Sequence, residues 1–349
     1  MTRIGRRNVL AGATIALLPA PLAAQGKSFK LLLNTGFSGP VAFLLLAEDK
    51  GYLGEEGLHV SFAPGDGAAA IVPRVRAGDF DLGYGDITAL IERIALGAPG
   101  EGPVAIWTTF NTVPFTIAVA AAGPIRSPKD FEGKTISGHP LDAALITFDM
   151  FAKANNVDIS KVKVVKSGDA MGNQVAAMVR ATADVQGVFG FVNTIIASVA
   201  PLGIDSAREL RFMNYADNLP DMYGNGLFVT RETYRDNRDK LRGLVRAFNR
   251  ALADTVKSPD VAIDALVKRV PGANRDINRV RLAGTLNSEM AHPEGARLGV
   301  GDMDDARLAR LIALVAEAKS LPRKPGIREV FDRSFLPPDA ERIRSLARN

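Results

Sequence analysis

Short apolar strands and helical stretches alternate along the first two thirds of this 349-residue chain, and no other feature limits its possible folds as strongly. Residues 29–33 predict a strand, and Pro40, which fits the first turn of a helix, opens a helical stretch that reaches about Lys50. Residues 57–62 predict the second strand. Strands and helices that alternate at such short intervals are typical of an α/β fold whose sheet is largely parallel.

The alternation continues through two successive sets of elements. The first set predicts helices over residues 68–77, where Pro73 favours a late start or a kink, and over 87–96, capped by Asp86, with strands over 80–84 and 104–110. After an apolar segment at 115–120, the second set predicts strands over 135–137, 162–165 and 184–189 and helices over 141–154, 173–180 and 193–202. Two sets predict two domains.

The C-terminal third is predicted to be helical. Leu241, Leu244 and Phe248 follow the spacing of one helix face, and we expect such stripes to pack on the first domain. The length agrees with two domains, because about 325 residues remain after an N-terminal signal and a single core rarely grows beyond roughly 250–300 residues.

The N-terminus predicts export. Residues 1–24 carry Arg3, Arg6 and Arg7 but no acidic residue, then an apolar run that ends in small residues near Ala24. This is the plan of a cleaved signal peptide, and the run is shorter than the roughly 20 apolar residues that span a bilayer. The arginine pair favours the twin-arginine route, and a Sec signal that carries two arginines is the alternative.

Charge and cysteine content exclude several classes of function. Three of the 43 basic residues lie in the signal, which leaves 40 against 38 acidic residues, and no long basic run suggests nucleic-acid binding. The chain has no cysteine, which excludes disulfides, thiol nucleophiles, cysteine-bound metal and an N-terminal lipid anchor. We therefore expect a soluble periplasmic protein without a cofactor.

Several turns in order resemble one known family. Residues 48–60, EDKGYLGEEGLHV, are similar to the "KGYF…EEGLDV" stretch of periplasmic binding proteins for sulfonates, nitrate and thiamine-pyrimidine precursors. Further similar segments follow over nearly the whole mature chain, at residues 76–83, 127–138, 226–230 and 246–248.

The resemblance implies a type II periplasmic binding protein fold, with two mainly parallel sheets flanked by helices and a two-strand hinge. Carried onto this chain, it implies lobe one at 27–118 plus 226–349, lobe two at 122–222, and hinge strands at 115–120 and 226–230. The implied function is a monomeric receptor that captures a small molecule between its lobes and docks on the inner-membrane permease of an ABC importer.

Ligands of open α/β sheets lie beyond the carboxyl ends of the strands, and this rule selects candidate loops. The candidates are Asn34, Thr35, Phe37 and Ser38 after the first strand, Asp66 and Gly67 after the second, Asp86 after the third, Phe110 and Asn111 after the fourth, Ser137, His139, Phe191 and Asn193 in lobe two, and Tyr223 near the second crossover.

These loops suit a small anion or a heterocycle. Backbone N–H groups at helix starts favour an anion, and aromatic rings favour an apolar body. Asp66–Gly67 could also form only a tight turn, His139 could only precede Pro140, and Trp107 could be a core residue. Relatives that bind a thiamine pyrimidine often carry Trp where this chain has Thr35, which favours sulfonate-, nitrate- and carboxylate-like solutes. A pyrimidine-precursor binding protein for thiamine salvage stays an alternative.

Two other functions compete with import. A periplasmic enzyme exported with a folded cofactor is one, but the chain has three histidines, and no phosphate-binding loop or metal-ligand spacing appears. Pyrimidine-forming enzymes with this fold need a cysteine cluster, which the chain lacks. A sensor that presents its ligand to a signalling partner is the second, and the sequence does not separate it from an import receptor.

Overall fold

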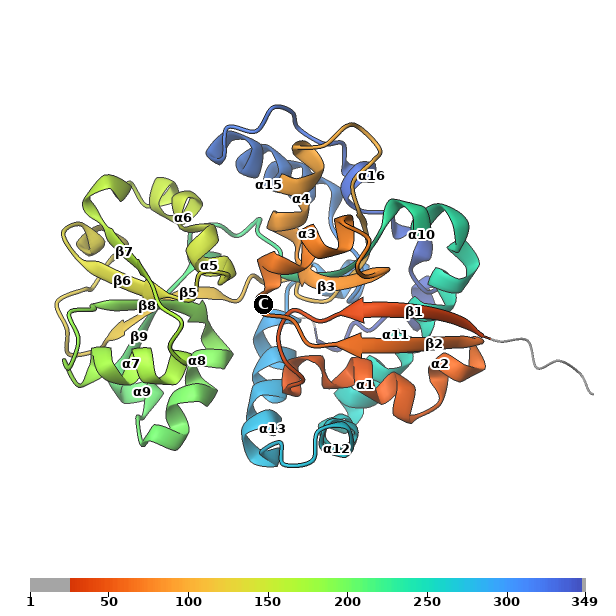
Figure 1. Ribbon diagram of the computed structural model, residues 1–349, viewed down its shortest axis with the longest axis horizontal. Coiled ribbons are helices and arrows are strands. Elements are labelled where there is room, and N and C mark those ends of the chain that lie inside the picture. Colours follow the sequence, from red (N-terminus) through yellow and green to blue (C-terminus); the bar gives the residue numbers. More distant parts are fainter. Residues whose placement is uncertain (1–25, 347–349) are drawn as a thin grey trace, which may run out of the picture.

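The chain folds around two separate five-stranded sheets, as Figure 1 shows for the computed structural model, which describes residues 26–346. The expected signal peptide, residues 1–24, lies outside the described residues. Sheet one has the order β2 (Leu58–Ala63), β1 (Lys27–Leu32), β3 (Leu82–Asp86), β10 (Asn225–Val229), β4 (Val104–Thr108). Sheet two has the order β7 (Lys163–Lys166), β6 (Thr135–Gly138), β8 (Gly187–Phe191), β5 (Phe115–Ala120), β9 (Leu210–Asn214). We call the parts built on them lobe one and lobe two.

Both sheets are mainly parallel, as expected, with one strand reversed. In sheet one β10 runs antiparallel to both neighbours, β3 and β4. In sheet two the reversed strand is β5, between β8 and β9. In each sheet the reversed strand is the one that the chain enters directly from the other lobe.

Residues 109–114 and 215–224 connect the lobes, and we call them the first and second connection. The expectation that strands 115–120 and 226–230 themselves cross between lobes is wrong, because β5 pairs on both edges within sheet two and β10 on both edges within sheet one. The division into lobe one at 27–118 plus 226–349 and lobe two at 122–222 stays a prediction. The sheet pairing favours lobe boundaries within the two connections.

Helices cover both sheets. Those of lobe one are α1 (Ala42–Asp49), α2 (Tyr52–Glu55), α3 (Ile71–Arg76), α4 (Ile87–Ala95), α10 (Arg231–Asp236), α11 (Arg238–Lys257), α12 (Pro259–Arg269), α13 (Arg275–Gly284), α14 (Gly295–Leu298), α15 (Asp305–Ala318) and α16 (Ile327–Val330). Those of lobe two are α5 (Ala143–Ile146), α6 (Phe148–Ala154), α7 (Met171–Val179), α8 (Val192–Val199) and α9 (Ser206–Glu209).

Local sequence accounts for several helix ends. Asp86 caps α4 by accepting a hydrogen bond from the backbone N–H of Ala89 at 2.7 Å, as predicted. The helix expected over 68–77 begins late, because a 3-10 turn at Ala68–Ala70 precedes α3 and places Pro73 in its first turn. The helix expected over 141–154 is two helices, α5 and α6, which meet at Thr147.

The C-terminal helices complete the core of lobe one, as their stripes predicted. Helices α11 and α12 pack against α1, and Leu241, Leu244 and Phe248 are fully buried there. Trp107 belongs to this core, stacked on the ring of Phe248 at 6.3 Å between centroids. The alternative that Trp107 contacts ligand is therefore not supported.

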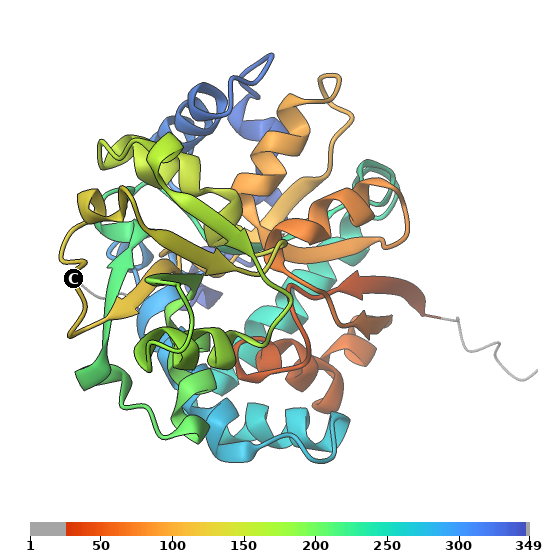
Figure 2. The ribbon, with the colours of Figure 1, turned by 60° about the vertical axis from the view of Figure 1, so that its left-hand side comes forward.

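The lobes touch on two sides. Helix α13 of lobe one lies against α8 of lobe two, and α15 lies against α6, an arrangement that Figures 1 and 2 show together. Between them, a Cβ atom added to Gly67 would lie 2.4 Å from the carbonyl oxygen of Leu141 in lobe two. This close approach requires glycine and indicates a closed arrangement of the lobes.

Candidate ligand-binding site

A cavity lies between the lobes, beyond the carboxyl ends of strands β1, β4 and β8. Both lobes contribute to its wall, as the fold predicts for a ligand site. The lining residues are Asn34, Thr35, Pro40, Gly67, Ala68, Phe110, Asp142, Ala143, Met171, Phe191, Asn193, Thr194, Arg281, Thr285 and Glu289.

Much of the wall is apolar. Phe110 lies two residues after β4, in the first connection, and Phe191 ends β8 of lobe two, where its ring centroid lies 5.2 Å from that of Phe115. Met171 at the start of α7 adds a flexible, polarisable side chain. Such a wall suits the carbon skeleton of an organic ligand.

One cation, Arg281 of α13, lies in this wall. Within the described residues, only the Thr194 hydroxyl lies within hydrogen-bond distance of the guanidinium, at 3.4 Å, and no carboxylate lies within 4.0 Å of it. Its Nε atom is buried without a partner. Burial lowers the pKa of Arg281. A buried guanidinium with free donors favours an anionic partner.

Glu289 lies in the same wall, at the end of the π-helical turn Thr285–Glu289 that follows α13. Its Oε1 accepts a hydrogen bond from the amide of Asn193 in lobe two at 2.7 Å, and its Oε2 is buried without a partner. Burial raises the pKa of Glu289. The carboxyl is therefore biased toward its neutral form, in which it donates a hydrogen bond.

Two further polar groups complete the wall. Asn34 is buried directly after β1, and its Oδ1 has no partner within the described residues. Asp142 caps α5 by accepting from the backbone N–H of Ala144 at 2.8 Å. Burial raises the pKa of Asp142 to about 6. Both groups lie where a ligand would face them, one from each lobe.

The sequence-predicted site residues divide into two groups. Those that line the cavity are Asn34, Thr35, Gly67, Phe110, Phe191 and Asn193. Those that do not are Phe37, Ser38, Asp66, Asp86, Asn111, Ser137, His139 and Tyr223. That any of the fourteen binds ligand stays a prediction.

Several residues of the second group have structural partners. Phe37 packs on the core of lobe one beneath Arg269, and Ser38 precedes the 3-10 turn Gly39–Val41. Asp66 is exposed, and Asp86 serves as the helix cap described above.

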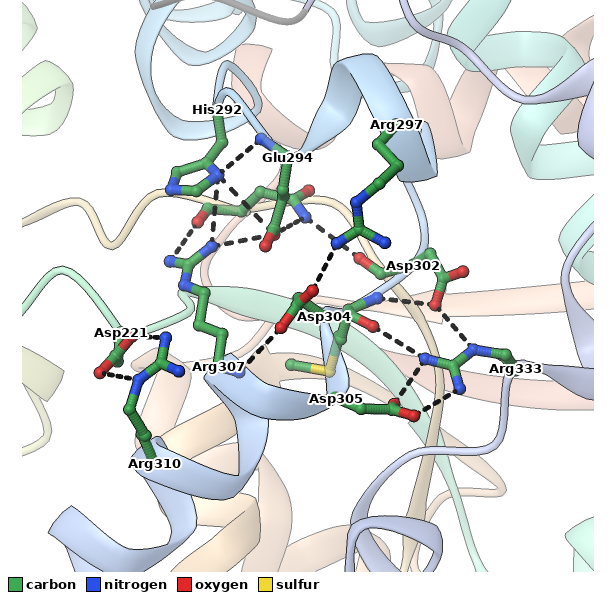
Figure 3. A network of polar contacts seen from close by, with 12 residues as sticks. Asp221, His292, Glu294, Arg297, Asp302, Asp304, Asp305, Arg307, Arg310 and Arg333 are labelled. Atoms are coloured by element: carbon green, nitrogen blue, oxygen red, sulfur yellow. Dashed lines mark hydrogen bonds and ion pairs between the residues drawn. The ribbon is translucent and has the colours of Figure 1, made fainter.

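The remaining members of this group are bonded away from the cavity. Ser137 donates to the side chain of Gln174 at 2.7 Å, and the His139 ring accepts from the backbone N–H of Leu141. Asn111 and Tyr223 each donate to Glu294, whose ion pair with Arg307 lies in the polar network of Figure 3.

The strand-end rule missed the charged part of the wall. Arg281, Thr285 and Glu289 come from C-terminal helices, Asp142 is the N-cap of α5, and Thr194 lies in the first turn of α8. No local signal separates Arg281 from Arg279 on the same helix, which is exposed and paired with Asp260. Only the three-dimensional packing of α13 against lobe two distinguishes them.

The described residues hold no cluster of three or more His, Cys, Asp or Glu that could bind a metal ion. None of their helices is long and apolar enough to cross a membrane.

Comparisons with known proteins agree with this geometry. The family model described as "NMT1/THI5 like" matches residues 39–262. No curated protein matches the sequence. Among solved structures, the alkanesulfonate-binding protein SsuA from Xanthomonas axonopodis pv. citri, bound to MOPS, is 15% identical with a TM-score of 0.65, covering 88% of this chain and 99% of its own.

Two other solved structures extend the comparison. The periplasmic aliphatic sulphonate-binding protein SsuA from Escherichia coli is 15% identical with a TM-score of 0.64, covering 87% of this chain and 97% of its own. The desulfurization enzyme DszB, solved as a cysteine-to-serine mutant with biphenyl-2-sulfinic acid, is 15% identical with a TM-score of 0.58, covering 88% and 97%. At such identities these likenesses show the fold alone. With the family model matched over more than half of its length, this chain belongs to the NMT1/THI5-like family and has the two-lobed fold of periplasmic binding proteins.

Proposed function

We propose that the protein is a solute-binding receptor that captures a small organic anion between its two lobes. The observation that carries this proposal is Arg281, a partly buried guanidinium in the interlobe cavity whose Nε is buried and which has no carboxylate within 4.0 Å in the described part of the chain. Burying an unpaired charge is costly, so the site is arranged for a partner that arrives from outside.

The apolar wall narrows the ligand class. Phe110, Met171 and Phe191 would leave a bare inorganic anion such as nitrate mostly against carbon, whereas an organic sulfonate or carboxylate could place its head group at Arg281 and its skeleton on these side chains. The Xanthomonas SsuA structure, which holds the sulfonate MOPS, supports the same class.

A receptor fits the cavity better than an enzyme. The described side chains that line it include no His and no Cys, and the ionisable ones are Asp142, Arg281 and Glu289. The enzyme DszB shares the fold, so the fold alone does not decide between the two functions.

We further propose that the receptor is exported to the periplasm through its N-terminal signal and passes its ligand to an ABC permease. The arginine pair at Arg6 and Arg7 supports export, and the periplasmic SsuA proteins of the same fold support an import role.

A thermal-shift screen followed by calorimetry tests the proposal on the purified mature chain. The screen compares alkane- and arylsulfonates, carboxylates, nitrate and neutral pyrimidines. Organic anions are expected to raise the melting temperature of the wild type, and an Arg281→Gln variant is expected to lose that response. Stabilisation by neutral pyrimidines alone, or an unchanged response in Arg281→Gln, would contradict the proposal.

A further inference from the structure

One guanidinium contacts both connections between the lobes. The Nη2 atom of Arg307 donates to the carbonyl oxygen of Asn111 in the first connection and to that of Met222 in the second, each at 2.7 Å. The two connections are separated by more than a hundred residues, and this side chain joins them in space.

Arg307 is itself fixed to lobe one. It lies near the start of α15, is almost fully buried, and pairs through Nη1 with Glu294 at 2.9 Å. Its guanidinium covers the ring of Tyr223, 3.9 Å from the ring centre. The Glu294 carboxylate also accepts from the Asn111 amide at 2.7 Å and from the Tyr223 hydroxyl at 3.1 Å, so both connections contact this ion pair.

The two connections also bind each other at the lobe-one end. The N–H of Gly224 donates to the carbonyl oxygen of Phe110 at 2.9 Å. The N–H of Phe110 donates to the carbonyl oxygen of Asn225 at 3.1 Å. A Cβ atom on Gly224 would lie 2.9 Å from the Cβ of Phe110, so the approach leaves no room for a side chain. This end of the hinge is a packed unit of lobe one.

A short segment links this unit to the cavity. Glu289 lines the cavity with its side chain, and its carbonyl oxygen accepts from the N–H of Thr112 in the first connection at 2.9 Å. The Thr112 hydroxyl donates to the carbonyl oxygen of Ala291 at 2.7 Å. Glu294, five residues after Glu289, holds Arg307. The wall of the cavity and the hinge are thus parts of one continuous stretch of chain.

We propose that Arg307 is a positioning residue that clamps both connections to lobe one and confines interlobe bending to residues 113–114 and 216–221. The other end of the second connection is held by lobe two, because the Tyr215 hydroxyl donates to the carbonyl oxygen of Ala144 there at 2.6 Å. The inference rests on the proposed function only in that closure serves ligand capture, because the clamp acts on lobe geometry in the absence of any ligand.

The interlobe distance of the ligand-free protein tests this clamp. The chain has no cysteine, so Leu96→Cys in lobe one and Ile159→Cys in lobe two, both exposed, place two spin labels at defined positions. Arg307→Lys keeps the charge but loses the planar fork that serves two carbonyls and a carboxylate together. Arg310→Met is the matched control, because Arg310 lies one turn further along α15 and pairs with Asp221 of the second connection at the surface.

Arg307→Lys is expected to broaden the distance distribution relative to the wild type, and Arg310→Met is expected to leave it unchanged. Arg307→Met should broaden it further if that variant folds, and Arg307→Lys decides the matter if it does not. A wild-type distribution in folded Arg307→Lys, or equal broadening in Arg310→Met, would overturn the clamp. Neither result depends on whether an anion binds, so failure of the proposed function is detected separately, by the ligand screen.

Discussion

The molecule contains two buried arginine–glutamate sets between its lobes, and they are built in opposite ways. In the hinge, Arg307 and Glu294 form an ion pair at 2.9 Å, and the guanidinium also bonds two carbonyl oxygens. In the cavity, Arg281 and Glu289 do not pair within 4.0 Å, and among the described residues the Arg281 guanidinium bonds only the Thr194 hydroxyl, at 3.4 Å.

The difference separates a charge that stabilises the fold, on Arg307, from a charge that is available to a ligand, on Arg281. A buried charge needs compensation, and the hinge supplies it from within the chain. The cavity leaves Arg281 without an ion-pair partner within 4.0 Å, and burial raises the pKa of Glu289 in the same wall. Removing the hinge arginine should therefore cost stability, and removing the cavity arginine should cost affinity.

The largest effect is expected for Arg307→Met. This change leaves Glu294 buried without its cation and two carbonyl oxygens without their donor, and losing one partner of a buried pair costs about 3–5 kcal/mol. Urea unfolding of the variant against the wild type measures the loss of unfolding free energy. The surface variant Arg310→Met should unfold like the wild type, and equal losses in the two would remove the distinction between a clamp and a surface ion pair.

The next effect is expected for Arg281→Gln, measured by calorimetry with an organic anion found in the screen. Loss of a buried charge-assisted contact costs about 2–5 kcal/mol of binding free energy, or roughly 30-fold to several-thousand-fold in affinity. Unfolding free energy should stay unchanged or rise, because an uncompensated buried charge is removed. Arg279→Gln on the same helix is the control, and comparable affinity loss there would point to the overall charge of α13 instead.

A smaller effect is expected for Gly284→Ala. A Cβ at this position would lie 2.3 Å from Oδ1 of Asn193, so the lobes must separate slightly or Asn193 must release Glu289. We expect about tenfold weaker binding, equivalent to roughly 1.4 kcal/mol, through faster ligand release. Adding Asn193→Ala should restore part of the affinity. Gly54→Ala, whose Cβ meets nothing within 4 Å, should bind as the wild type; if it does not, the steric explanation fails.

The smallest effect is a pH dependence that arises from Asp142. Its pKa of about 6 lies above the ordinary value of 3.8, so the carboxyl becomes neutral as pH falls through 6 and stops repelling a bound anion. Anion affinity should rise by less than tenfold between pH 7 and pH 5. The same shift means that folding stability falls as pH rises from about 4 to 6, because the folded state holds the proton longer.

Asp142→Asn tests this dependence, since Asn also caps helices well. Calorimetry across the same pH range should show a flatter affinity profile in the variant. A profile identical to that of the wild type would assign the dependence to another group, of which Glu289 is the first candidate because its pKa is also raised.

The sequence predicted the fold well because the information was local. Alternating apolar segments indicated the strands and helices, and Asp86 was recognised as a cap from its position before an apolar run. The strand β9 and helix α9 were missed, since residues 206–214 are a short mixture of charged and apolar residues without a clear period. The reversal of β5 and β10 was missed as well, because strand direction depends on pairing partners that lie about a hundred residues away.

The site was predicted only in part for the same reason. Strand-end geometry places Asn34 and Phe191 at the cavity, since the ends of parallel strands meet at one edge. It also selects Asn111 and Tyr223, which lie at the correct edge but are used by the hinge network. Arg281 and Glu289 reach the cavity from α13 and the turn after it, in the C-terminal third that was predicted only as helical, and the packing of α13 on lobe two brings them there.

The reversed strand β10 has a consequence for the order in which the molecule can assemble. It lies between β3 and β4, so the central sheet of lobe one is incomplete until residue 229 has been synthesised. Every strand of lobe two lies within residues 115–214. Sheet two can therefore form first, from one contiguous segment. The strands of lobe one that precede it in the chain lack β10 until that later segment has been synthesised. Such late, non-local pairing slows folding, so lobe one is expected to complete its sheet after lobe two.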